Sequence, residues 1–253
     1  MKIITIIKQT FDTEEKIVIQ NGNIIEDGVN YIINPYDEYA IEEAIKLREE
    51  HGGEVTVISV GTDQTEPALR TALAMGVDHA ILIENEDYQL DEYSTVKILS
   101  SVIKEREFDI ILGGNLSVDY GSGQIGPRLA EELNIAQVTT ITNLEIDGHK
   151  AIVERDVEGD KEIIEVTLPV LLTAQQGLND PRYPSLPGIM KAKKKSIEVL
   201  KIDDLDMDEL EVKTITSETF FPPNKNIGRI LTGELKAQIT ELTTLLRNEA
   251  KVI

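Results

Sequence analysis

Cysteine and tryptophan are both absent from the 253 residues of this chain. Without cysteine the chain forms no disulfide, offers no thiolate nucleophile and supplies no ligand to an iron–sulfur cluster. Histidine is also scarce. His51, His79 and His149 are scattered, and their spacing does not match that of a metal site. We therefore expect neither a metal centre nor thiol chemistry.

Aromatic residues make up only 4% of the chain, although hydrophobic residues reach 41%, so the core must be built from aliphatic side chains. Long apolar runs are missing too, and none approaches the length of a membrane span. The first ten residues carry an apolar run too short for a signal peptide and lack a small-residue cleavage site. We expect a soluble, cytoplasmic protein with no direct membrane insertion.

Positive charge is in short supply, with 25 Lys and Arg against 46 Asp and Glu and a net charge of -21. Such a surface repels a phosphate backbone, which argues against nucleic-acid binding and is explained most simply by solubility. The run from Lys191 to Lys195 is a local exception.

Apolar strands alternate with amphipathic helices through the first half of the chain. This order predicts an α/β fold, a Rossmann-like parallel sheet with helices on both faces, which would bind a ligand at the carboxyl ends of its strands. A small hairpin is expected around Asn21-Gly22. The predicted strands are Ile3–Ile7, Val55–Val60, Ala80–Ile83 and Ile110–Leu112; the helices follow the break at Asn34–Asp37 and then span Glu66–Met75, Asp91–Arg106 and Gly123–Leu133.

Strands without intervening helices follow from about Val138, and they predict an antiparallel extension of the sheet. The extension is expected to include Val170–Leu172. Beyond it we expect a surface turn or short helix over Asp203–Glu211, a break at Phe220–Pro223 and a final helix over Leu231–Arg247. We divide the chain into a domain of residues 1–200, which includes a loop of residues 175–195, and a C-terminal arm of residues 201–253.

The loop from Gly113 to Gly126 is glycine-rich and joins a strand to a helix. Gly121, Gly123 and Gly126 permit close backbone approach, and a helix start presents N–H groups to an anion. The loop matches neither a Walker motif nor a dinucleotide fingerprint, so phosphate binding and a plain tight turn both stay open. Elsewhere no nucleophile or acid–base pair stands out, and Asp119 alone is more typical of a turn, so we expect no catalytic residues.

Residues 179–195, NDPRYPSLPGIMKAKKK, form the most specific segment. Three prolines favour an extended loop with Leu186 at its tip, and a short basic helix is expected over Ile189–Lys195. The segment is either a rigid surface loop or, because an apolar tip beside lysines suits a partner, a docking element.

This segment closely resembles the recognition loop and signature of electron transfer flavoprotein beta subunits. Further similarities lie at Asn34–Asp37, Arg70–Gly76, Val153–Asp160 and Thr167–Thr173, and they cover about residues 1–200. The resemblance implies an alpha subunit that holds redox-active FAD, with structural AMP in the beta subunit of conventional members. In bifurcating members a second FAD takes the AMP site; residues 179–188 resemble the conventional group more. Electrons would come from acyl-CoA dehydrogenases and pass to a membrane quinone oxidoreductase.

The resemblance also implies roles for individual residues. Thr13 and Tyr36 would lie near the partner's flavin, Asp156 would face the flavin and the alpha subunit, and Leu186 would anchor a dehydrogenase with Lys191 and Lys194 beside it. The arm of residues 201–253 would pack on the alpha subunit. The AMP site would use Ile6, Lys8, Asn34, Pro35, Tyr36, Asp37, Val60, Ser117, Val118, Asp119, Gly121, Ser122, Gly123, Gln124, Ile125 and Gly126.

Two alternatives are kept beside this electron carrier. A stand-alone adenylating enzyme would need a pyrophosphate loop such as Ser-Gly-Gly-x-Asp-Ser near the N-terminus, where the chain has Lys8-Gln-Thr-Phe-Asp. A nucleotide-sensing stress protein would be shorter and would lack the proline–lysine loop.

Overall fold

The computed structural model describes residues 1–86, 88–207, 209–225 and 228–253. Contacts divide the chain into two units. The first comprises residues 1–18 and 25–217, and the second comprises residues 19–24 and 218–253. Each unit is described by itself.

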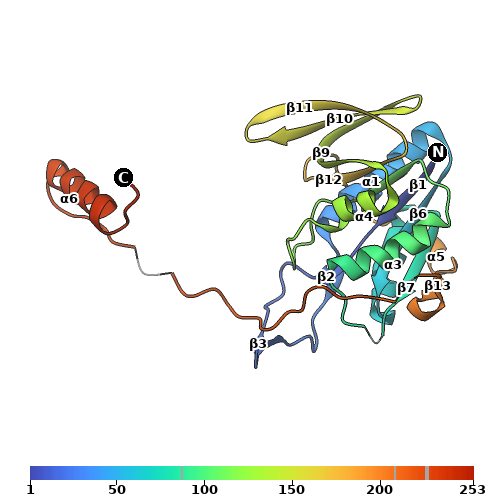
Figure 1. Ribbon diagram of the computed structural model, residues 1–253, viewed down its shortest axis with the longest axis horizontal. Coiled ribbons are helices and arrows are strands. Elements are labelled where there is room, and N and C mark those ends of the chain that lie inside the picture. Colours follow the sequence, from blue (N-terminus) through green and yellow to red (C-terminus); the bar gives the residue numbers. More distant parts are fainter. Residues whose placement is uncertain (87, 208, 226–227) are drawn as a thin grey trace. The chain divides into compact units, whose positions relative to one another are not determined.

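A sheet of nine strands forms the centre of the first unit (Figure 1), in the order β11-β10-β9-β12-β8-β1-β6-β7-β13. A smaller two-stranded ladder pairs β2 (Gln9–Phe11) with β5 (Tyr31–Ile33). The nine strands are β1 (Lys2–Ile6), β6 (Glu54–Gly61), β7 (His79–Glu84), β8 (Ile110–Gly114), β9 (Ala136–Asp147), β10 (Lys150–Val157), β11 (Asp160–Thr167), β12 (Val170–Ala174) and β13 (Glu198–Lys201).

The sheet is parallel from β9 to β13 and antiparallel only where β10 joins β9 and β11. The chain runs from β1 outward to β6 and β7, then returns to the other side of β1 to form β8. This reversal creates a topological switch point between β1 and β8, the place where open α/β sheets bind ligands.

Helices cover both faces of the sheet, as the strand–helix alternation predicts. Helices α1 (Pro35–His51) and α2 (Glu66–Met75) pack on one face, and α3 (Glu92–Lys104) and α4 (Ile125–Leu133) pack on the other. Successive strand residues alternate between the two faces. Ile3 therefore joins the core beneath α1 and α2, and Ile4 joins the core beneath α3 and α4.

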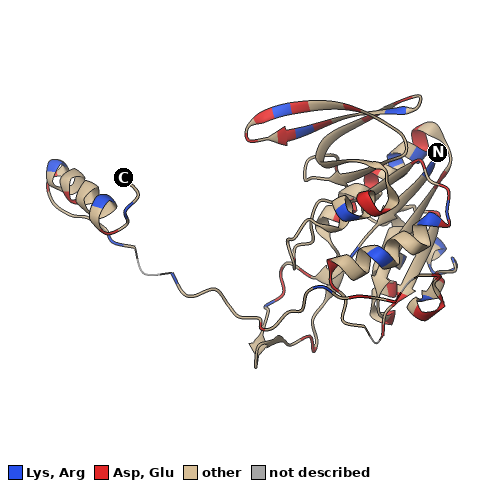
Figure 2. Ribbon diagram, in the orientation of Figure 1, with Lys and Arg blue, Asp and Glu red and all other residues tan. Residues whose placement is uncertain are grey.

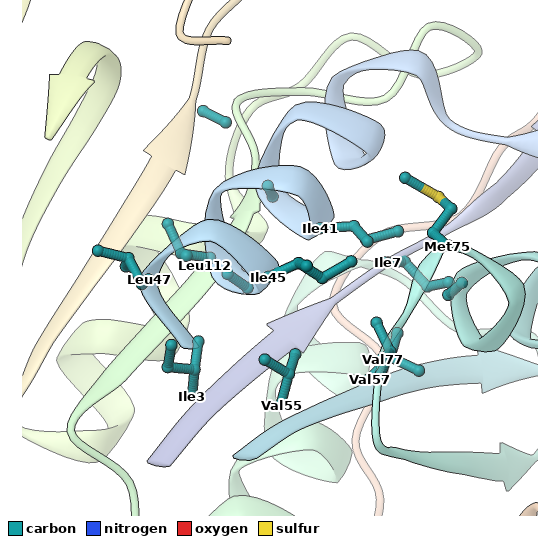
Figure 3. Packing of buried hydrophobic residues seen from close by; sticks show 14 of the residues in the cluster. Ile3, Ile7, Ile41, Ile45, Leu47, Val55, Val57, Met75, Val77 and Leu112 are labelled. Carbon is teal, nitrogen blue, oxygen red and sulfur yellow. The ribbon is translucent and has the colours of Figure 1, made fainter. Parts of the chain in front are cut away.

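Aliphatic side chains make up both cores. In Figure 3, Ile41 and Ile45 of α1 lie between the helix and the strands that carry Ile3, Val55 and Leu112. Ile3, Ile41, Ile45 and Leu112 are almost fully buried. This packing holds α1 against the sheet, and Asp37 in its first turn lies at the carboxyl ends of β1 and β8.

Several elements differ from the sequence predictions. The motif Asn34–Asp37 does not break the chain: Asn34 is the N-cap and Pro35 occupies the first turn of α1, where its missing N–H costs nothing. Strand β12 is no part of an antiparallel extension, because it lies parallel between β8 and β9. Strand β13, parallel to β7, was not predicted at all.

The docking segment also differs. Helix α5 spans Leu186–Ala192 and so starts earlier than the predicted basic helix. The Ser185 side chain caps it by accepting a hydrogen bond from the Gly188 N–H, and Pro187 is tolerated in the first turn. The predicted tip, Leu186, is therefore the first residue of a helix. Residues 202–204 form a short 3₁₀ helix within the acidic stretch, of which position 208 lies outside the described residues.

The second unit contains the predicted hairpin, β3 (Ile19–Gln20) with β4 (Asn23–Ile24), and helix α6 (Leu235–Asn248). Helix α6 begins four residues later than predicted, since Leu231–Glu234 precede it. None of the α6 residues, all of which the structure describes, is buried.

Candidate functional site

A cavity of about 360 Å³ opens at the carboxyl edge of the sheet, around the switch point. Its walls come from the ends of β1, β6 and β8, from the start of α1, from the connection between β7 and α3, and from the glycine-rich loop before α4. Ile6, Ile7, Val60 and Leu99 give it apolar surface, while Lys8 adds a positive charge. Apolar walls with few polar groups are typical of small-molecule sites.

The first turn of α1 holds two of these loops in place. Asn34 is buried; its amide donates to the Leu116 carbonyl at 2.9 Å and its carbonyl oxygen accepts from the Val118 N–H at 3.1 Å. The buried carboxylate of Asp37 accepts from the Lys8 N–H at 2.7 Å and the Gly114 N–H at 2.8 Å. One helix start therefore ties the ends of β1 and β8 together.

Burial raises the pKa of Asp37 to about 7, against the lowering effect of its hydrogen bonds with Lys8, Asn34 and Gly114. The carboxyl group thus titrates near neutral pH. Asp37 also lines the cavity.

The glycine-rich loop delivers backbone amides to the cavity. Gly121 and Gly123 adopt φ values of 66° and 62°, which side chains rarely tolerate. Among the described residues no side chain caps the start of α4, so its first N–H groups remain available to an anion. A methyl group on Gly126 would meet the Thr173 side chain at 2.6 Å, which shows how closely this helix start approaches β12.

Lys8 lines the cavity and contacts the glycine-rich loop. Its Nζ forms an ion pair of 2.5 Å with Asp119 and sits 4.4 Å from the centre of the Tyr120 ring. The Asp119 carboxylate also accepts from the Tyr120 N–H. Asp119 is therefore a partner of Lys8 and part of a turn, and its geometry is not that of a general base.

The structure brings most of the predicted nucleotide-site residues to the cavity. Five predicted residues do not line it: Pro35, Tyr36, Val118, Asp119 and Gly121. Their backbones belong to the turns that shape the wall. The predicted residues that line it are Ile6, Lys8, Asn34, Asp37, Val60, Ser117, Ser122, Gly123, Gln124, Ile125 and Gly126.

Sequence reasoning missed the wall that joins β7 to α3. Asn85, Leu90, Asp91, Glu92 and Thr95 line the cavity there. A signal for them existed, because Ala80–Ile83 was recognised as a parallel strand and its carboxyl end must open at the same edge as its neighbours. The described part of the chain contains no group of three or more side chains suited to a metal ion.

The family described as "Electron transfer flavoprotein domain" matches residues 21–205. "Electron transfer flavoprotein subunit beta" of Bacillus subtilis is 60% identical over 100% of both chains. The chain belongs to the beta-subunit family of electron transfer flavoproteins.

More distant members of this beta-subunit family are similar along most of their length. The human electron transfer flavoprotein subunit beta is 34% identical over 96% of this chain and 98% of its own. "Caffeyl-CoA reductase-Etf complex subunit CarD" of Acetobacterium woodii is 37% identical over 92% of each chain. As an electron transfer flavoprotein beta subunit, the protein is an electron-carrier subunit, and this membership implies an alpha subunit as its partner.

The residues expected to face partners lie away from the cavity lining. Thr13 is exposed in a turn after β2, Asp156 is exposed on β10, and Tyr36 is half-buried in the first turn of α1. Leu186 is 80% exposed at the start of α5. Lys191 and Lys194 are exposed as well. Among the described residues, no helix has the length and apolar character needed to span a bilayer.

Proposed function

We propose that this electron transfer flavoprotein beta subunit binds AMP in the cavity at the carboxyl edge of the sheet. The observation that carries the proposal is the meeting of an uncapped helix start, a loop of left-handed glycines and an apolar wall in one cavity. The phosphate would lie on the amides around Gly123 to Ile125, where the helix dipole favours an anion. The adenine would lie against aliphatic residues such as Val60 and Leu99.

We favour AMP over a second FAD because residues 179–188 resemble the conventional members more than the bifurcating ones. The cavity is also modest in volume. At about 360 Å³ it lies near the lower end of the roughly 300–1,000 Å³ range of ligand pockets. FAD adds a flavin, a ribityl chain and a second phosphate to the same nucleotide. AMP brings no redox chemistry, so its role would be structural, holding together the loops that Asn34 and Asp37 already join.

Electron transfer would then depend on FAD held mainly by the alpha subunit. FAD supplies the redox chemistry when bound; this chain would place Thr13, Tyr36 and Asp156 beside it. The alpha subunit would also cover α6, whose Leu235, Ile239 and Leu242 are exposed. An arm of residues 201–253 on a domain of residues 1–200 fits this arrangement.

Docking of the electron donor would occur at the segment 175–195. Leu186 would enter a pocket on an acyl-CoA dehydrogenase, with Lys191 and Lys194 steering the approach. The electrons would pass on to a membrane quinone oxidoreductase, and the heterodimer would work in the cytoplasm.

Nucleotide analysis tests the AMP assignment. The heterodimer, purified and denatured, should release one AMP and one FAD. Gly123→Ala should lower the AMP content, since Gly123 has a φ of 62° and an added methyl group would meet the Asn115 carbonyl at 3.3 Å. Gly148→Ala is the matched control, because Gly148 has a φ of 59° in a hairpin turn with open space around it. Release of two FAD and no AMP would instead identify a bifurcating member.

Truncation tests the arm. A chain that ends at Pro223 keeps all of β1 to β13 but lacks α6. It should co-purify poorly with the alpha subunit while it still folds. A stable, flavin-loaded heterodimer formed by the truncated chain would argue against a role of α6 in pairing.

A further inference from the structure

Arg182 ties the segment that precedes α5 to α1 through both its side chain and its backbone N–H. Arg182 donates from Nε and Nη2 to the two oxygens of Glu42, at 2.8 and 3.0 Å, and its backbone N–H donates to the same carboxylate at 3.1 Å. Its Nη1 and Nη2 also donate to the two oxygens of Glu49, at 2.7 and 3.1 Å. A guanidinium that forms bidentate hydrogen bonds with two carboxylates has little freedom to move.

Glu42 is buried, so its carboxylate needs the positive charge of Arg182. Glu42 is only 5% exposed, and a buried carboxylate is costly unless a cation and hydrogen bonds compensate it. Next to it, the buried Glu43 accepts from the Asn179 side chain at 2.8 Å, and Asn179 also donates to the Tyr39 carbonyl. The outer face of α1 is therefore built to receive residues 179–182.

The far end of the segment is fixed as well. Arg70 of α2 donates from Nη1 to the carbonyls of Ala192 and Lys195 at the end of α5. Lys195 donates in turn to the carbonyls of Val77 and Asp78. Between the two attachments, Tyr183, Leu186 and Met190 are 93%, 80% and 60% exposed. Apolar side chains are thus held out to solvent on a backbone that is anchored on both sides.

We infer that Arg182 is a positioning residue for partner docking: its two-carboxylate clamp on α1 fixes Leu186 in the orientation that the electron donor recognises. The inference rests on the proposed docking role of residues 175–195. Arg182 acts through the loop and contacts no cofactor. Fixing the loop before contact removes the cost of ordering it on binding, so the clamp contributes to affinity and leaves the rate of the saturated complex unchanged.

The test uses the heterodimer with its alpha subunit and an acyl-CoA dehydrogenase that reduces it. Arg182→Lys keeps the charge but loses the double fork. We expect it to raise the KM for the flavoprotein roughly three- to tenfold with an unchanged kcat. Hydrogen exchange of residues 179–190 in the free heterodimer should become faster. Arg106→Lys is the control, because Arg106 also pairs with a carboxylate, Glu198 of β13, but lies with its partner outside residues 175–195.

A double variant separates positioning from direct contact. If Arg182 acts by positioning Leu186, the double variant Arg182→Lys, Leu186→Ala should have the same KM as Leu186→Ala alone. Two results would overturn the inference and leave the docking proposal standing. In one, the rises in KM of the two single variants multiply in the double variant. In the other, Leu186→Ala raises the KM but Arg182→Lys leaves it unchanged. An unchanged KM in Leu186→Ala would remove the docking proposal itself. Should Arg182→Lys fail to fold, Glu49→Gln, which weakens only the outer fork, provides the same comparison.

Discussion

Asp91 offers a quantitative test of how the chain is held together beside the cavity. Its carboxylate caps α3 by accepting from the Ser94 N–H and hydroxyl, both at 2.8 Å. Its other oxygen accepts from the backbone N–H groups of Lys213 and Thr214, both at 2.8 Å. One buried carboxylate therefore joins the start of α3 to a segment more than a hundred residues away in sequence.

The cost of Asp91→Ala follows from these contacts. Loss of an N-cap costs about 1 kcal/mol, and hydrogen bonds to a charged group contribute about 1.5–3 kcal/mol. The exposed residues Lys213 and Thr214 recover part of this by turning to water. We expect the free energy of unfolding to fall by about 2–4 kcal/mol. Ser185→Ala, which removes only the cap of α5, should cost about 1 kcal/mol or less.

The stability that Asp91 contributes also depends on pH. Burial alone would raise the pKa of Asp91, but the hydrogen bonds from Ser94, Lys213 and Thr214 outweigh it and hold the pKa well below its usual range. Asp91 therefore stabilises the fold above the unfolded-state pKa of about 4 and loses that contribution as pH falls further. Asp91→Asn keeps the capping geometry but carries no charge. The difference in free energy of unfolding between the wild type and Asp91→Asn should therefore shrink below about pH 4.

Urea unfolding of the wild-type chain, Asp91→Ala, Asp91→Asn and Ser185→Ala between about pH 3 and pH 8 measures these differences. The reasoning is refuted if Asp91→Ala costs no more than Ser185→Ala, or if the gap to Asp91→Asn stays constant down to the lowest pH. Faster hydrogen exchange at residues 211–215 in Asp91→Ala would locate the loss at the tethered segment.

Three further outcomes are expected. Gly126→Ala should lower stability by about 1–3 kcal/mol through overpacking against Thr173, measured by urea unfolding; full stability would mean that α4 moves away freely. Because burial raises the pKa of Asp37 to about 7, its contribution to stability is lost as pH rises from about 4 to 7. The free energy of unfolding of the wild type relative to that of Asp37→Asn should fall by roughly 2–4 kcal/mol over that interval. A difference that does not change with pH would show that the pKa of Asp37 is not raised. Leu186→Ala should weaken dehydrogenase binding about tenfold or more in a kinetic titration, whereas Ile215→Ala, equally exposed, should not; equal affinities would remove Leu186 from docking.

The fold was largely predictable because its information is local. Strands such as β7 and β8 are buried on both faces and contain continuous apolar runs. Helix α2 has the bounds that its pattern predicts, Glu66–Met75, ended by Gly76. The glycine-rich loop before α4 was recognisable for the same reason, since a strand, a turn and a helix start all lie within about twenty residues of sequence. The start of α1 was misplaced, because Asn34 and Pro35 occur both in chain breaks and at helix starts.

Long-range pairing was not predictable in the same way. Strand β12 follows the hairpin strands directly, so its neighbours in sequence suggested antiparallel pairing. Its five residues are all buried, because it inserts between β8 and β9 at the centre of the sheet. An almost wholly apolar strand is typical of parallel sheets, and the contrast with β11, whose residues are mostly exposed and often charged, was the available signal. The contact between Asp91 and residues 213–214 has no sequence signature, because a carboxylate accepts here from two backbone N–H groups that are distant in sequence.

Helix α1 explains why the cavity and the docking segment occur in one small chain. Its first turn supplies Asn34 and Asp37 to the loops around the cavity, and later turns supply Glu42 and Glu49 to Arg182. Its apolar face is locked onto the sheet by residues that are fully buried, so the helix does not shift at one end alone. A rigid element that holds two sites fixes the distance between them. That constraint favours an electron carrier, because transfer between docked cofactors depends on placement and needs no nucleophile or base.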